Sequence, residues 1–211
     1  MENKVFQAFY CIKKEETMKF NFFEKIELII SNPSKFFDKI QKEKNLSETF
    51  KFYFIFVFLS VLINILFSLQ DIIKSNLDLS LPKYLLFILV LAIFILLVVF
   101  ITSATSFIIY WIYHIIIKTF KGKEKYLETY KLLYAATPLL LVSLIPYYEI
   151  FKIIFYPLFI IAAIDTFYIE YIGLQKLQKL SKENAITVII ISVLIAIFSI
   201  LFLLKHNILT L

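Results

Sequence analysis

Long uncharged apolar runs, separated by short lysine-rich segments, dominate this chain of 211 residues. Four of the runs carry no charged residue, and a fifth, residues 153–169, is interrupted only by Asp165. Each run is a candidate span, because a helix needs about 20 apolar residues, with a range of about 17–25, to cross the hydrocarbon of a bilayer. The pattern predicts an all-α fold, a polytopic membrane helix bundle. The five predicted spans are about residues 52–69, 84–117, 132–148, 153–171 and 185–204.

The second run, residues 84–117, is much longer than one bilayer crossing requires. As a single helix it would be about 51 Å long, against a hydrocarbon core of about 30 Å. Splitting it would leave nothing for a turn, and its centre, residues 102–106, contains neither Gly nor Pro. We therefore predict one continuous helix that crosses the whole membrane and protrudes slightly. Tyr110, Trp111 and Tyr113 should lie at headgroup depth near its end.

Two short amphipathic helices are predicted in the N-terminal segment, residues 1–49. Apolar residues recur at helical spacing over residues 22–30 and again over residues 36–40. Between them, Asn32 is a good N-cap and Pro33 suits the first position of a helix. Neither helix is long enough to span a bilayer, so both should lie on the membrane surface or on other parts of the protein.

The lysine residues determine the expected orientation of the membrane domain, residues 50–205. All 22 basic residues are Lys, and 18 of them fall in residues 1–51 and in the segments 118–131 and 176–182. Cytoplasmic segments of membrane proteins carry the excess of Lys, so we expect a multi-pass cell-membrane protein with its N-terminus in the cytoplasm and its C-terminus outside. The basic inner face should favour anionic lipid headgroups.

The cytoplasmic end of the second span needs a cover. Its side chains are apolar almost all round over residues 107–117. The N-terminal helices and a stripe formed by Tyr126, Leu127, Tyr130 and Leu133 fall on the same side of the membrane in this topology. We predict that they pack on this end of the helix as a small cytoplasmic cap.

Patterns typical of catalytic, metal or cofactor sites are missing from the sequence. The two histidines, His114 and His206, are far apart and lie in no zinc-binding motif. Two glycines cannot form a phosphate-binding loop, and one cysteine cannot form an internal disulfide or a thiolate cluster. Without Arg, planar bidentate recognition of phosphate cannot occur. We expect no cofactor, no metal and no nucleic-acid partner, and we predict that the protein is not an enzyme. His114 should have a hydrogen-bonding role.

Asp165 is the most informative polar residue, because an ionised side chain inside a span costs about 2.5–3.5 kcal/mol on insertion scales. It should therefore face protein or water rather than lipid. Thr102, Ser106 and Lys131 fall at a comparable depth in the predicted topology, and Glu170 follows Asp165 on the same helix. The two interpretations are polar contacts between helices and a proton or cation site shared by Asp165 and Glu170.

Other polar, small and proline residues in the spans indicate helix packing. Asn64 in the first span should form polar contacts between helices. Pro138 and Pro157 should kink the third and fourth spans, and Pro146 should begin the turn between these spans. The predicted stripes of small residues are Ser192, Ala196 and Ser199 on the last span and Ala162 and Thr166 on the fourth.

Several short motifs occur in a distinctive order. The motif positions are Asn32, Pro33 and Phe37 before the first span, Tyr134 and Pro138 at the start of the third, and Gly173 at the end of the fourth. Over roughly residues 24–204, this order resembles the Yip-domain family, five-span proteins named for interaction with Ypt/Rab GTPases. The resemblance implies a cytoplasmic N-terminus, as the lysine distribution does. The chain lacks the Asp-Leu-Tyr-Gly-Pro stretch that eukaryotic relatives, linked to vesicle trafficking, carry before their first span, and it looks more like the compact prokaryotic members.

The leading functional hypothesis is a non-enzymatic membrane protein that organises or shapes membrane, or recruits partners through its cytoplasmic cap. The alternative is a small transporter or permease component that uses Asp165 and Glu170, with backbone carbonyls freed at Pro138 and Pro157. An Asp165→Asn variant separates the two hypotheses. It should leave folding and partner capture nearly intact under the first, and should abolish proton- or cation-coupled flux under the second.

Overall fold

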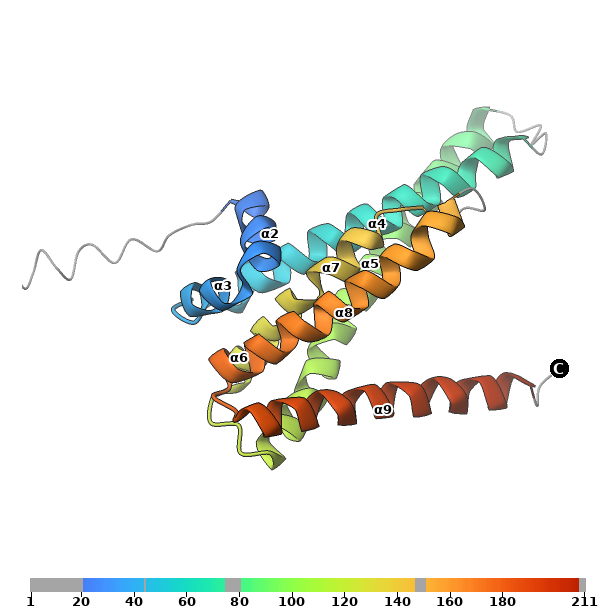
Figure 1. Cartoon of the computed structure of the whole chain (residues 1–211). Helices are drawn as coiled ribbons and strands as arrows, with labels where there is room; N and C mark the ends of the chain where they lie inside the picture. Colours follow the sequence, from blue (N-terminus) through green and yellow to red (C-terminus); the bar gives the residue numbers. More distant parts are fainter. Residues whose placement is uncertain (1–20, 44, 75–80, 147–150, 209–211) are drawn as a thin grey trace, which may run out of the picture.

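Four long helices and several short ones, gathered toward one end, make up this computed structural model (Figure 1), which describes residues 21–43, 45–74, 81–146 and 151–208. The elements are α2 Phe22–Ser31, α3 Pro33–Ile40, α4 Leu46–Lys74, α5 Leu81–Thr119, α6 Tyr126–Tyr130, the 3-10 helix η1 Lys131–Ala136, α7 Thr137–Val142, α8 Lys152–Leu177 and α9 Lys182–Ile208.

The long helix α5 is continuous over 39 residues, which corresponds to about 58 Å. The prediction of one unbroken helix is therefore confirmed. After Pro82 in its first turn, α5 contains neither Gly nor Pro, so no residue interrupts its ladder of hydrogen bonds. Among the described residues, four helices are long and apolar enough to cross a membrane. These candidate spans are Leu46–Ser68, Phe87–Thr119, Lys152–Leu177 and Lys182–Ser199.

The third predicted span, residues 132–148, is not one regular helix. It begins as η1 and continues as the short helix α7. Pro138 marks the change, because it has no N–H to donate to the carbonyl of Tyr134. The Thr137 hydroxyl donates to that carbonyl at 2.6 Å, and so does the Thr137 N–H. The kink predicted at Pro138 is thus a change of helix type, and the predicted turn after Pro146 lies outside the described residues.

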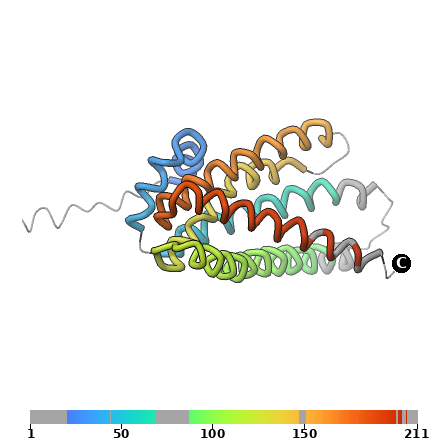
Figure 2. The backbone as a smooth tube through the Cα atoms, turned by 60° about the horizontal axis from the view of Figure 1, so that its bottom comes forward, coloured from blue at the N-terminus to red at the C-terminus, as the bar shows by residue number. Residues whose placement is uncertain are grey.

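The helices pack mainly with their neighbours along the chain. Helix α4 packs along α5, and η1 and α7 pack along α8 (Figures 1 and 2). Helix α8 continues through Pro157 without ending there. Helix α9 contacts α8 and α5, and it diverges from α8 in both views. Its first turns are the packed part, since Ala185 and Val188 are fully buried whereas Phe198 is exposed.

Helices α2 and α3 form where the apolar periodicity placed them. Asn21 caps α2 in a capping box with Glu24, so two backbone N–H groups at the helix start are satisfied. The Asn32 side chain accepts a hydrogen bond from the Lys35 N–H at 3.0 Å, and Pro33 is the first residue of α3. The N-cap and first-position proline predicted between the two helices are confirmed.

These two helices cover a different part of the bundle from the one predicted. Helix α3 packs chiefly on α8, and α2 packs on α3 and α7, whereas α6 packs on α5. The expected cover of α5 by the N-terminal helices is therefore wrong, and among the described residues the segment that follows α5 covers this end together with α4 and α9. Because α6 has five residues, it reaches a single side of α5. The side chains that stay about half exposed there are Ile108, Ile109, Trp111, Ile112 and Ile115.

The buried apolar core lies where the short helices meet the ends of the long ones. We call this region, formed by α2, α3, α6, η1 and the adjoining ends of α4, α5, α8 and α9, the cap. Among the residues with no exposed surface are Ile29, Phe36, Phe37, Ile40, Ile117, Leu132, Tyr134, Leu174 and Leu177. In the most apolar stretches of the four candidate spans, only 11 to 17% of the residues are buried.

Candidate functional site

Lys25 is the first of two lysines buried inside the cap, with 4% of its surface exposed. Its Nζ donates a hydrogen bond to the Tyr134 hydroxyl at 3.2 Å, and carboxylate oxygens of Glu43 and Glu48 lie 3.7 and 3.8 Å away. A buried ammonium group needs such partners, since removing it from water costs several kcal/mol. Lys25 therefore ties α2 to η1 and to the start of α4.

Lys131 is the second buried lysine and has no exposed surface. Its Nζ donates to Glu128 Oε1 at 2.8 Å and to the carbonyl of Gln41, at the end of α3, at 3.3 Å. The negative end of a helix dipole favours a cation at this position. Burial raises the pKa of the Glu128 carboxyl, although Lys131 opposes the shift. The pair therefore joins α3 to the segment that follows α5.

A chain of side-chain contacts connects α5, α6 and the turn between α8 and α9. His114 Nδ1 lies 2.7 Å from the Thr129 hydroxyl, which also accepts a hydrogen bond from Gln178 Nε2 at 3.0 Å. Asn184 in α9 donates to the carbonyl of Phe120 at 3.0 Å. The hydrogen-bonding role predicted for His114 is confirmed. These contacts fix the turn of α8 and α9 against the end of α5.

Most of the family-like motif positions meet inside the cap. Phe37 and Tyr134 are fully buried there, and Asn32 and Pro33 start the helix that carries Phe37. At Gly173, an added Cβ would lie 2.7 Å from Leu132 Cδ2 and 2.9 Å from Phe37 Cζ. Glycine at this position lets α3 and η1 approach α8 closely. Pro138 is buried at the start of α7.

The predicted intramembrane polar residues do not form one site. Asp165 is exposed on α8, and within the described part of the chain it makes no hydrogen bond or ion pair. Within the described ranges no hydrogen bond or ion pair joins it to Ser106 or Lys131, which interact with Tyr130 and Glu128. Asn64 donates to the Ser60 carbonyl one turn earlier in α4, at 2.9 Å. Ser60 itself, which the sequence did not single out, donates to the carbonyl of Ser143 at 2.8 Å and joins α4 to the segment after α7.

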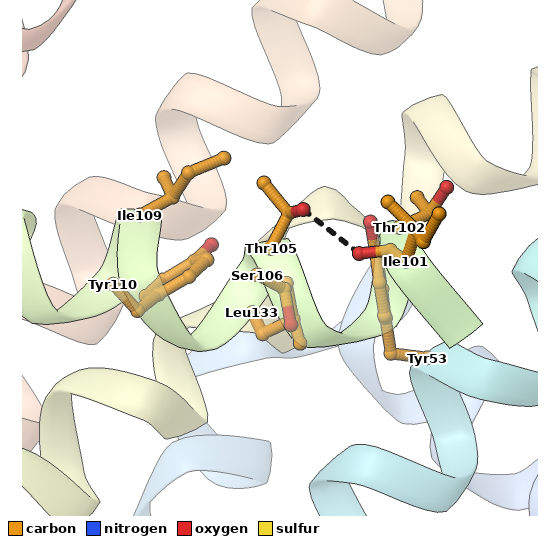
Figure 3. A pocket seen from close by; sticks show the side chains of 8 residues that line it. All are labelled: Tyr53, Ile101, Thr102, Thr105, Ser106, Ile109, Tyr110 and Leu133. Carbon is orange, nitrogen blue, oxygen red and sulfur yellow. Dashed lines mark hydrogen bonds between the residues drawn. The ribbon is translucent and has the colours of Figure 1, made fainter. Parts of the chain in front are cut away.

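Thr102 and Ser106 line an open groove of about 270 Å³ beside α5 (Figure 3). The Ser106 hydroxyl interacts with the Ser103 carbonyl at 2.7 Å and the Tyr130 hydroxyl at 3.1 Å, and Thr105 donates to the Ile101 carbonyl at 2.8 Å. The Thr105 hydroxyl is thus bonded within α5, whereas the Ser106 hydroxyl also connects α5 to α6. The other lining residues are Tyr53, Ile109, Tyr110 and Leu133. The groove is largely apolar and lies within the candidate span of α5.

Glu170 points away from Asp165. The two side chains are five residues apart on α8, so they project about 140° from each other. Glu170 instead lies near the hydroxyl of Tyr113, as does Ser192 of α9. The Tyr113 hydroxyl is buried without a hydrogen bond of good geometry to any described residue. The shared site of Asp165 and Glu170 predicted by the second interpretation is therefore not formed.

Sequence reasoning missed Lys25 and its partners. A signal was present, because Lys25 falls between Phe22 and Ile29 on the apolar side of α2, three and four residues from them. A charged residue on such a side must either interrupt the packing or find a buried partner. The partner could not be predicted, since Tyr134 is 109 residues away in sequence.

The chemistry that this arrangement offers is binding through packing, charge and hydrogen bonds. In the described ranges, no group of three or more His, Cys, Asp or Glu residues could hold a metal ion. The family model of the Yip1 domain matches residues 26–204, from within α2 to within α9. No curated protein and no solved structure matches the chain. The matched range contains all of the motif positions described above.

Proposed function

The chain belongs to the Yip1 domain family, and from this premise we propose that it is a non-enzymatic membrane protein whose cap is a rigid cytoplasmic platform. The platform organises the membrane around the protein and recruits a partner to it. Its apolar helices and its family make it an integral membrane protein.

The platform is supported by the location of the tight packing, which is concentrated in the cap. The cap contains fully buried aromatic residues and two buried lysines with partners from several helices. In contrast, the intramembrane polar residues are dispersed, and Asp165 and Glu170 project in different directions. Such an arrangement is more suitable for a rigid binding surface than for the transport path of a substrate.

We propose five membrane crossings, the third of which starts in η1, where the cap meets the membrane, and continues through α7. These elements pack along α8, and their twelve residues cover about 21 Å before the chain continues to residue 146. With this crossing, the cap and the Lys-rich segments lie on one side, and Lys152 and Lys205 lie on the other. The excess of Lys on the cap side favours a cytoplasmic cap and an external C-terminus.

The exposed face of the cap is basic around two adjoining turns. Residues 118–125 hold four Lys and one Glu, and Lys121 and Lys123 are exposed. Lys179 in the next turn pairs with Glu124, and the Lys123 N–H donates to the Gln178 carbonyl at 3.2 Å. This face should attract anionic headgroups or an acidic partner surface.

The platform is tested by reversing charge on this face. In a Lys121→Glu/Lys123→Glu variant, we expect several-fold less cross-linked partner and less anionic lipid to co-purify from native membranes, measured by quantitative mass spectrometry. Lys205→Glu, at the opposite end of the molecule, is the matched control and should change neither. Asp165→Asn should also leave both intact. Unchanged capture in the double variant, with loss of cation- or proton-coupled flux in Asp165→Asn, would reject the platform.

A further inference from the structure

Helix α2 has three sides, and the described residues of the protein pack on one of them. Lys25 and Ile29 are buried, and the ring of Phe22 lies 5.1 and 5.2 Å from the rings of Phe52 and Phe56 in α4. This packed side fixes the height and the rotation of α2 relative to α4. The remaining two sides differ from each other in polarity.

The second side is apolar and uncovered. Phe23 is 76% exposed and Ile30 is 49% exposed, although each is a large hydrophobic residue outside the candidate spans. They are seven residues apart, so both project in nearly the same direction, within about 20° of each other. Ile26, partly buried, lies between this direction and the packed side.

The third side is polar. Glu24, Glu27 and Ser31 are exposed and project on the far side of Phe23 from Ile26. Around the helix, the side packed on the protein is therefore followed by an exposed apolar side and then by an exposed polar side. A helix that lies in the boundary between lipid and water, with protein on one side, requires this order of surfaces.

The contacts of Phe22 place α2 at the height of that boundary. Phe52 is the first residue of the uncharged run of α4, and it follows Lys51 and Glu48, whose charges mark the water side. One turn from Phe52, Ile55 is 41% exposed on the candidate span of α4. Phe22 therefore holds α2 beside the start of α4, at the height where the uncharged and partly exposed surface of that helix begins (Figure 1).

We propose that α2 is an interfacial helix whose Phe23 and Ile30 side chains insert into the membrane leaflet on the side of the cap, among the acyl chains just below the headgroups. The partner of this surface is the lipid leaflet. Anchored in this way, α2 fixes the rest of the cap relative to the membrane surface through the hydrogen bond between Lys25 and Tyr134. The inference goes beyond the platform role, because it holds whatever the cap recruits.

The test uses tryptophan fluorescence in the full-length protein. Trp111 is the only tryptophan, so a Trp111→Phe background allows one reporter at a time. Three variants add Phe23→Trp, Ile30→Trp or, as the matched control on the polar side, Glu27→Trp. Each is reconstituted in vesicles of phospholipid brominated on the acyl chains close to the headgroup, and its quenching is compared with that in unbrominated vesicles.

We expect reporters at positions 23 and 30 to be quenched at least twofold more than the reporter at position 27, with blue-shifted emission. Equal, weak quenching at all three positions would overturn the proposal. So would emission at position 23 that is blue-shifted without being quenched, since a protein surface rather than lipid would then cover the residue. Co-purification of partners is a separate readout, so failure of this test and failure of the platform can be told apart.

Discussion

Phe37 in the cap and Phe198 on α9 are both phenylalanines in helices, yet Phe37 is fully buried and Phe198 is 72% exposed. The cap excludes solvent by packing short helices from distant parts of the chain around shared aromatic residues. Helix α9 diverges from α8 and leaves most of its apolar surface to its surroundings. Because lipid tails are as apolar as the side chains, no hydrophobic force drives that surface onto other helices. Hydrophobicity therefore produces a core in the cap and a lipid-facing surface in α9.

The largest expected difference between the two regions comes from truncating these two phenylalanines. Phe37→Ala should lower the free energy of unfolding by about 3–5 kcal/mol, the usual cost of removing a fully buried ring. Phe198→Ala should lower it by less than about 0.5 kcal/mol, since an exposed side chain leaves no cavity. Denaturant titration in lipid nanodiscs measures both. Equal effects would show that the cap is not the main source of stability.

A smaller loss of stability is expected from removing the Tyr134 hydroxyl, which accepts a hydrogen bond from Lys25. Tyr134→Phe keeps the buried ring but leaves the ammonium group with only the carboxylates of Glu43 and Glu48, at 3.7 and 3.8 Å. The loss should be about 1.5–3 kcal/mol, typical of a hydrogen bond to a charged group. Tyr168→Phe, on the exposed side of α8, is the control and should be nearly neutral. A neutral Tyr134→Phe variant would mean that Lys25 reaches water.

The smallest of the three effects comes from filling the close contact at Gly173. In Gly173→Val the new side chain would collide with Leu132 and Phe37, and the strain should cost about 1–3 kcal/mol. Ala196→Val on the exposed part of α9 adds bulk where nothing is packed and should change stability little. Thermal unfolding of both variants in the same detergent gives the comparison. If Gly173→Val is as stable as the parent protein, α3 does not approach α8 closely.

Local sequence signals were sufficient for some elements. The absence of Gly and Pro from the centre of α5 correctly predicted a continuous helix, and Asn32 with Pro33 correctly predicted the start of α3. The short motifs also led to the right family. Each of these predictions depends on neighbours along the chain, where backbone geometry decides the outcome.

Predictions that required a contact partner were less successful. The apolar periodicity of α2 and α3 gave their buried sides but not the surface they pack on, because several apolar surfaces on the same side of the membrane are equally suitable. The closeness permitted by Gly173 brings α3 to α8 rather than to α5. Asp165 was expected to meet polar residues at its own depth, but Ser106 and Lys131 already have partners in the cap region.

Hydrogen exchange of α2 and α3 in lipid nanodiscs tests whether the cap is a rigid, packed unit. We predict that the amides of residues 22–40 exchange as slowly as those at the cap end of α8, and that Phe37→Ala accelerates exchange in α3 and α8 together. The account would be contradicted if residues 22–40 exchanged as fast as an unstructured peptide while the long helices stayed protected.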